Sequence, residues 1–185
     1  MEQKALRKTL WEEAGKAGLA LGAVSSAYLF MTQFIGNIEM PAVVTMLVNT
    51  VLWAAKFGGC IWLMMYFMKK FCKQHPSVGN GTTYRLGLAI SVLSALVYAA
   101  ASFANTAFIS ADMINEQYIA LMEQLAPVMD SNSMAQMSEV MENLPQLTFV
   151  SNLIYCTIFG CVLSFILSRN IPSRDPFANI PTDEQ

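Results

Sequence analysis

Carboxylates are absent from the long apolar stretches of this chain, and charge is scarce throughout it. Only 13% of its 185 residues are charged and 55% are hydrophobic, whereas about a quarter of the residues in soluble domains are charged. Four stretches are long enough to cross a bilayer core, which takes about 20 helical residues. They are residues 17–35, 43–68, 86–109 and 147–168, and none contains Asp or Glu. The composition therefore predicts an all-α integral membrane protein, a four-helix bundle within residues 1–170.

Signatures of catalysis are lacking too. The chain has no nucleophile elbow, no phosphate-binding loop and no His-Glu-x-x-His segment, and His75 is its only histidine. Spans without Asp or Glu provide neither a catalytic carboxylate pair nor a proton relay. We therefore expect that the protein is not an enzyme and uses no cofactor.

Cysteine and methionine do not change this expectation. Three of the four cysteines fall within the apolar stretches, so they do not form a disulfide framework. Six methionines lie between residues 110 and 146, and thioether sulfur suits Cu(I). Four of the six fall on apolar helical stripes, where Met is an ordinary packing residue. No metal site is expected.

Basic residues are missing from two of the three connections between the apolar stretches. Ten of the eleven Lys and Arg residues precede the first stretch, lie between the second and the third, or follow the fourth. By the positive-inside rule, these segments face the cytoplasm. Both termini are therefore expected to be cytoplasmic, and residues 110–146 external. The formal net charge of −2 argues against a nucleic-acid partner.

The segment 110–146 is too long for a simple connection. It holds six Asp and Glu residues and no Lys or Arg. Apolar residues at helical spacing mark two stripes, which are Ile114, Tyr118, Leu121, Met122 and Leu125, then Met134, Met137, Met141 and Leu144. We expect an external amphipathic helical hairpin between spans three and four, with its apolar face down on the outer end of the bundle. Ser133 and Gln136 resemble a capping box for its second helix.

The chain ends and the small residues allow further expectations. Residues 2–16 are expected to form an interfacial amphipathic helix, and residues 171–185 a disordered cytoplasmic tail. Small residues recur at a spacing of four in three stretches, beginning with Gly18 and Gly22, and permit close helix packing within the bundle or between copies. A glycine pair, Gly58-Gly59, is a position where the second stretch could bend.

One charge does interrupt the second stretch, in the segment NTVLWAAKFGGCIWLMMYF. Lys56 is separated from Lys69 by ~20 Å of helix, and a charge near the bilayer centre costs at least ~2.5 kcal/mol. Amide side chains could accept a hydrogen bond from it, which defines a candidate intramembrane polar site. Its members are Lys56, Asn49, Gln33, Asn105 and Asn152, with Tyr98 and Tyr155 as further polar neighbours. Lys56 is either structural, through tilt, snorkelling or polar packing, or functional, at a hydrated cavity, an anion or a partner's acid; a neutral lysine is a further alternative.

Together these features resemble a known family. The first stretch contains KAGLALGAVSSAYLF, the second carries a lysine followed by an aromatic-rich end, and a short basic connection precedes a long acidic one. Over residues 10–170 the chain is similar to small bacterial membrane proteins grouped as domain of unknown function 4199. The resemblance implies a multi-pass protein of the bacterial inner membrane and no established activity.

Two functional hypotheses follow. In the first, the protein is a non-enzymatic assembly or interaction subunit. It would be surrounded by membrane lipids and would meet a protein partner or another copy of itself through the acidic loop or the small-residue helix faces. In the second, it is a small transporter or channel subunit with Lys56 at an anion or partner-acid site.

Overall fold

The computed structural model describes residues 2–36, 38, 40–76 and 78–171, and the regular structure in these ranges is entirely helical. Four helices are long: α1 (Glu2–Gly36), α2 (Ala42–Gln74), α3 (Asn80–Ala104) and α6 (Leu144–Asn170). A π-helical turn, η1 (Asn105–Ile109), extends α3, and two shorter helices follow it, α4 (Ala111–Leu125) and α5 (Ser131–Glu142). The all-α prediction is confirmed for these residues. The tail expected at the C-terminus lies, from residue 172 onward, outside the described residues.

All four long helices have the length and the apolar composition needed to cross a membrane. Each contains one of the expected stretches, α3 together with η1. α1 differs from expectation because it is one continuous helix from Glu2, with no break before the first stretch. Its early turns carry two ion pairs, Lys8–Glu12 at 3.8 Å and Lys16–Glu13 at 2.8 Å. Pairs at this helical spacing favour continuation of the helix.

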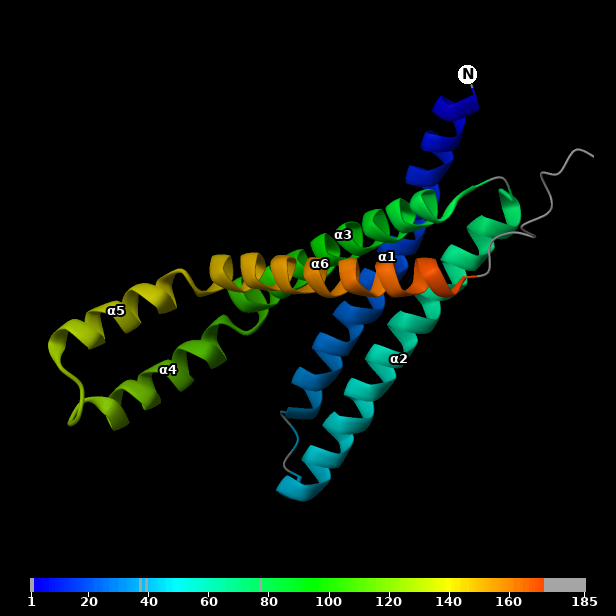
Figure 1. Cartoon of the computed structure of the whole chain (residues 1–185). Coiled ribbons are helices and arrows are strands. Elements are labelled where there is room, and N and C mark those ends of the chain that lie inside the picture. Colours follow the sequence, from blue (N-terminus) through cyan, green and yellow to red (C-terminus); the bar gives the residue numbers. More distant parts are fainter. Residues whose placement is uncertain (1, 37, 39, 77, 172–185) are drawn as a thin grey trace, which may run out of the picture.

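The long helices form two antiparallel pairs that cross, α1 with α2 and α3 with α6 (Figure 1). The start of α1, the α2–α3 connection and the last turn of α6 lie together at one end of the molecule. The basic residues of the long helices, apart from Lys56, belong to the segments near this end, which we call the basic end. At the opposite end the two pairs diverge.

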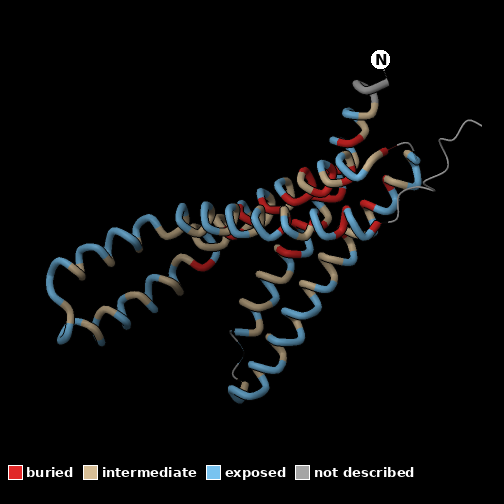
Figure 2. The backbone as a smooth tube through the Cα atoms, in the orientation of Figure 1, coloured by how far each residue is buried: buried red, intermediate tan, exposed pale blue. Residues whose placement is uncertain are grey.

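The buried core lies toward the basic end, as the red segments of Figure 2 show. Its largest side chains are no more than 1% exposed, and they are Met64, Met68 and Phe71 of α2 with Leu86 and Ile90 of α3. Toward the diverging ends, large apolar side chains cover the surface, for example Phe34, Val51 and Ile154. This distribution suits helices surrounded by lipid, since lipid tails are as apolar as the side chains.

Small residues bring α3 close to both of its neighbours. A Cβ added to Gly18 or Gly22 of α1 would lie 2.6 Å from the Cβ of Leu93 or Val97 of α3, respectively. On the other side of α3, a Cβ at Gly87 would lie 2.8 Å from the Ser164 Cβ of α6. These glycines therefore serve packing within the chain.

The glycine pair of α2 behaves differently. Gly58 and Gly59 have nothing within 4 Å of an added Cβ. α2 also runs from Ala42 to Gln74 without interruption, so the glycine pair does not break the helix.

The two short helices extend away from the bundle, which contradicts the prediction that they fold over its outer end. They lie side by side and continue the direction of the α3–α6 pair beyond its end (Figure 1). We call α4, α5 and their connection the arm. Its two apolar stripes line a hollow between the helices, with Ile114, Tyr118 and Leu121 on one side and Met137 and Met141 on the other. The stripes face each other because the opposite helix is their nearest apolar surface.

The helix caps of the arm also differ from expectation. α5 begins at Ser131, and its N-cap is Asp130, whose carboxylate accepts a hydrogen bond from the Ser133 backbone N–H at 3.3 Å. The predicted capping box at Ser133 is therefore wrong, because the Asp130 carboxylate already satisfies that N–H. Ser110 precedes α4 without a side-chain cap; its hydroxyl oxygen accepts a hydrogen bond from the Gln33 amide instead.

Candidate functional site

The Lys56 ammonium lies between two aromatic rings. Its Nζ is 4.7 Å from the ring centroid of Tyr28 on α1 and 4.7 Å from that of Tyr98 on α3. Lys56 belongs to the uninterrupted helix α2, and its side chain extends from that helix toward α1 and α3. Lys56 thus points into the bundle, where rings occupy the place in which amides were expected.

The two rings offset part of the cost of this charge. A cation over an aromatic face gains ~0.5–1 kcal/mol at exposed sites and ~2 kcal/mol when desolvated, so two faces give ~1–4 kcal/mol. Insertion measurements put the cost of a lysine at the centre of a membrane helix at ~2.5–3.5 kcal/mol. The free energy contributed by the rings of Tyr28 and Tyr98 is thus comparable with this insertion cost of the charge. They attract the charge without neutralising it, because a ring has no net charge.

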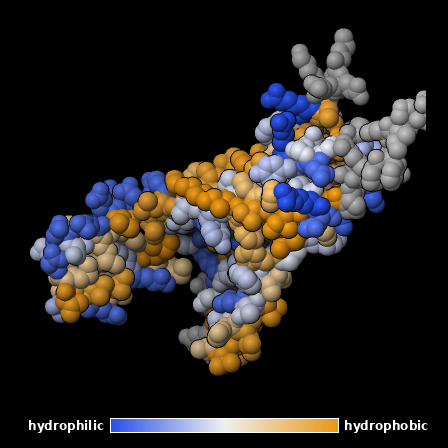
Figure 3. All heavy atoms as spheres, in the orientation of Figure 1, coloured by the Kyte–Doolittle hydropathy of each residue, from blue (hydrophilic) through white to orange (hydrophobic). Residues whose placement is uncertain are grey.

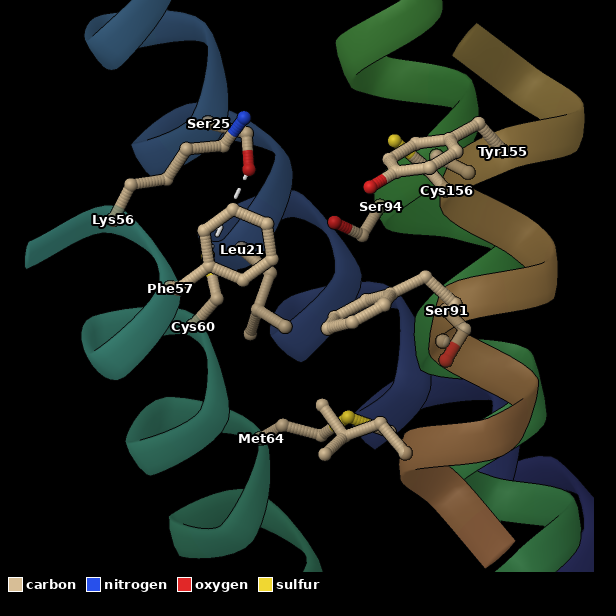
Figure 4. Close-up of a pocket in the computed structure, with 14 residues that line it drawn as sticks. Leu21, Ser25, Lys56, Phe57, Cys60, Met64, Ser91, Ser94, Tyr155 and Cys156 are labelled. Carbon is tan, nitrogen blue, oxygen red and sulfur yellow. Dashed lines mark hydrogen bonds between the residues drawn. The ribbon is translucent and has the colours of Figure 1, made fainter. Parts of the chain in front are cut away.

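A cavity of about 100 Å³ lies beside Lys56, and residues from all four long helices line it. In Figure 4, α2 forms one side and α6 the opposite side, while α1 and α3 lie between them. Phe57 of α2 and Phe159 of α6 meet edge to face at 5.4 Å between ring centroids. The labelled lining residues are Lys56, Phe57, Cys60 and Met64, then Leu21 and Ser25, Ser91 and Ser94, and Tyr155 and Cys156.

Small hydroxyl and thiol groups supply the neutral polar lining of the cavity. The Ser25 Oγ lies 3.7 Å from the Cys60 Sγ and links α1 to α2. The Ser91 Oγ donates to the Gly87 carbonyl at 2.8 Å and lies 3.2 Å from the Ser164 Oγ. Among the described residues that line this cavity, Lys56 is the only charged one. Its ammonium therefore determines which ligands the cavity favours.

No carboxylate among the described residues pairs with Lys56. The ion pairs in this part of the chain are Lys8–Glu12 and Lys16–Glu13. Beyond α1, the described acidic residues belong to the arm: Asp112, Glu116, Glu123, Asp130, Glu139 and Glu142. The ammonium is thus left without a counter-charge from the described chain.

None of the four amides of the candidate site is among the described residues that line the cavity beside Lys56. The Gln33 Nε2 donates to the Ser110 Oγ and so connects the end of α1 to the start of α4. The side-chain oxygens of Gln33, Asn49 and Asn105 are buried and have no hydrogen-bond partner among the described residues. Asn152 is half-buried on α6, one turn from Cys156 of the cavity. Of the candidate site, Lys56 is the residue that lines this cavity.

Sequence reasoning included two of the three tyrosines at this site and missed the third. Tyr98 lies against the ammonium and Tyr155 lines the cavity, whereas Tyr28 was not considered. It is the only tyrosine of the first stretch, which was a usable signal. Its position beside Tyr98 depends on how α1 and α3 are aligned, and that alignment is fixed by the close contacts at Gly18 and Gly22.

Comparison with known protein families gives a match over most of the chain. The model of a family described as a protein of unknown function (DUF4199) matches residues 16–169, which include Lys56, both flanking tyrosines and the arm. Neither a curated protein nor a solved structure matches the chain. The predicted resemblance to this family is confirmed.

Proposed function

The chain belongs to the DUF4199 family of proteins of unknown function, and from its own structure we propose that it is a non-enzymatic interaction subunit of the bacterial inner membrane. Four helices long and apolar enough to cross a membrane support this location. The positive-inside rule assigns the basic end, with both termini, to the cytoplasm and the arm to the outside.

The arm is the observation that carries this proposal. It extends beyond the bundle (Figure 1), and no residue of α4 or α5 is buried. Apolar and polar residues lie side by side on its surface (Figure 3). An amphipathic helix is stabilised when another element covers its apolar stripe. The two stripes of the arm face each other without burying any residue, and apolar side chains such as Ile119, Val128 and Val140 remain exposed. These exposed apolar side chains are available to a protein partner.

Replacement of residues 111–142 by a short Gly/Ser linker tests this role. The four long helices should still insert, because the arm contributes nothing to their buried core. Proteins that co-purify with the full chain in mild detergent should be lost from the variant, as measured by quantitative mass spectrometry. A Gly58→Ala variant is a suitable control, since its added Cβ meets nothing. An unchanged set of co-purifying proteins would contradict the proposal.

A second candidate function is favoured by the cavity at Lys56. A small transporter or channel subunit could hold an anion there, because Lys56 lines a cavity of about 100 Å³ and no carboxylate is among the described residues that line it. This volume suits a small ion. Loss of anion uptake in a stably folded Lys56→Met variant would favour this function, and unchanged uptake would exclude a role for Lys56 in it.

A further inference from the structure

Lys56 holds the one positive charge within the four apolar stretches, and those stretches supply no negative charge. No carboxylate among the described residues pairs with it. Tyr28 and Tyr98 lower the cost of the ammonium but leave its charge in place. Ionised groups inside membranes usually pair with opposite charges or face a water-filled cavity. A counter-charge brought by another molecule would therefore complete this site.

The cavity beside Lys56 reaches the surface of the bundle between α2 and α6. Tyr155 and Phe159, which line it from α6, are 63% and 39% exposed. The edge-to-face contact of Phe57 and Phe159 bridges the two helices on one side. The volume of about 100 Å³ admits a carboxyl group on a short stem but not a whole helix. A ligand side chain would therefore enter from the lipid-facing side, between α2 and α6.

The depth of Lys56 distinguishes between sources of an anionic group. Helix α2 continues for ~20 Å on either side of Lys56, from Ala42 to Lys69 and beyond. Lipid headgroups lie outside the ~30 Å hydrocarbon core, so a headgroup would have to sink about halfway through it. A side chain on a transmembrane helix is held at whatever depth its sequence position sets. The depth therefore favours a protein side chain over a lipid.

We infer that this cavity receives the Asp or Glu side chain of a transmembrane helix from a different protein, which lies in the opening between α2 and α6. A second copy of this chain is excluded as the source, because its four apolar stretches contain no Asp or Glu. The inference rests on the proposed interaction role and names a contact separate from the arm.

A synthetic transmembrane peptide provides the probe. It is a Leu- and Ala-rich helix with one central Glu, and the matched control peptide has Gln at that position. Purified full-length protein and dye-labelled peptide are reconstituted in phosphatidylcholine vesicles at about pH 8, which favours the carboxylate form, and association is followed by energy transfer. Hydrogen bonds between charged groups are about twice as strong as those between neutral groups. We therefore expect the Glu peptide to associate about tenfold more tightly than the Gln peptide. Equal association with the wild-type protein overturns the inference without any variant.

Two variants of Lys56 assign the preference to this residue. Lys56→Met should remove the preference for Glu, and Lys56→Arg, which keeps the charge, should retain most of it. A preference that survives in a folded Lys56→Met protein overturns the inference. The protein without residues 111–142 should keep the preference for the Glu peptide, because the arm is not part of this site. The co-purification experiment therefore tests the arm, and the peptide experiment tests the Lys56 cavity independently.

Free anions test whether the cavity binds a small anion or a lipid acid in place of a protein side chain. Acetate and oleic acid can be added to the same vesicles in place of the peptide. If either binds the wild type but not Lys56→Met, and the wild type shows no preference for the Glu peptide, the occupant is a small anion or a lipid acid. That result overturns the inference of a protein side chain.

Discussion

At the scale of single residues, two tyrosines provide for Lys56 part of what a carboxylate provides in a buried ion pair. Both rings lie 4.7 Å from the Nζ, and two such contacts contribute ~1–4 kcal/mol against an insertion cost of ~2.5–3.5 kcal/mol for the charge. The stabilisation by the two rings and the cost of inserting the charge are therefore of similar size. Lys56 can therefore remain in α2 for a function without a large loss of stability.

Removal of the charge should not harm the fold. We expect Lys56→Met to insert and to be at least as thermostable as the wild type in detergent, because a methionine sulfur also packs well against rings. Lys56→Glu should lower the melting temperature, since a carboxylate would face the negative faces of Tyr28 and Tyr98. Thermal unfolding of the purified proteins measures both effects. Clear unfolding of Lys56→Met would instead show that the lysine is a required structural element.

The ring of Tyr28 should contribute more to stability when the cation is present. Tyr28→Leu in the wild-type background should cost about 1–2 kcal/mol more than Tyr28→Leu in the Lys56→Met background, because only the first change removes a cation–π contact. A double-mutant cycle based on chemical unfolding measures the difference. Equal costs in both backgrounds would mean that Tyr28 stabilises the bundle through packing alone.

Asp130 makes the arm sensitive to acid. Hydrogen bonds from the Ser133 side chain and backbone hold the pKa of this carboxyl below its usual value. A carboxyl with a lowered pKa stabilises the folded form above its unfolded pKa of about 3.9 and loses this contribution as the pH falls through its folded value. Hydrogen exchange of the α5 amides, corrected for the intrinsic pH effect, should therefore speed up below about pH 4. Asp130→Asn keeps a capping oxygen without titrating, and its α5 should lack this transition.

At the scale of helices, the absence of Cβ atoms decides which helices approach closely. Gly18 and Gly22 fit against α3, and Gly87 fits against α6. Without these glycines the helix backbones would have to separate. Since lipid gives no hydrophobic drive for association, close packing is a main source of helix pairing in membranes.

Gly22 and Gly59 form a matched pair for testing this point. A methyl group at Gly22 would lie 2.6 Å from the Val97 Cβ, so Gly22→Ala should overpack the α1–α3 contact and cost ~1–3 kcal/mol. Gly59→Ala meets nothing within 4 Å and should be neutral or slightly stabilising, because Ala favours helix by up to ~1 kcal/mol. Thermal unfolding in detergent compares them. Similar melting temperatures for the two variants would contradict the packing role of Gly22.

The helices were predictable from sequence, whereas their contacts were only partly so. Apolar length alone fixed the four long helices, since each contains an expected stretch. Spacing of small residues also indicated close packing at Gly18 and Gly22. The direction of the arm was not predictable, because an amphipathic stripe is covered equally well by the bundle or by a facing helix. The Tyr28 contact was missed for a similar reason, as it depends on the alignment of two helices distant in sequence.

At the scale of the whole molecule, charge is divided between two extremities. The basic residues of the long helices, apart from Lys56, belong to segments near one end, while the charged residues of the arm at the opposite extremity are all acidic. The helices between them are apolar except for Lys56 and scattered neutral polar groups. This asymmetry fits a protein whose basic end stays in the cytoplasm while its arm is translocated, since translocation is impeded mainly by Lys and Arg.

Cysteine labelling tests this orientation directly. Ser131 lies in the arm and Gln74 at the basic end, and both are exposed, whereas the native cysteines are half-buried and should react slowly. We expect Ser131→Cys to react with a membrane-impermeant maleimide in intact spheroplasts, because the proposed orientation places the arm outside. Gln74→Cys should react only after the membrane is opened with detergent, because the proposed orientation places the basic end in the cytoplasm. The wild type measures the background from native thiols. The reverse pattern would place the acidic arm in the cytoplasm, and partners of the arm would then have to be sought there.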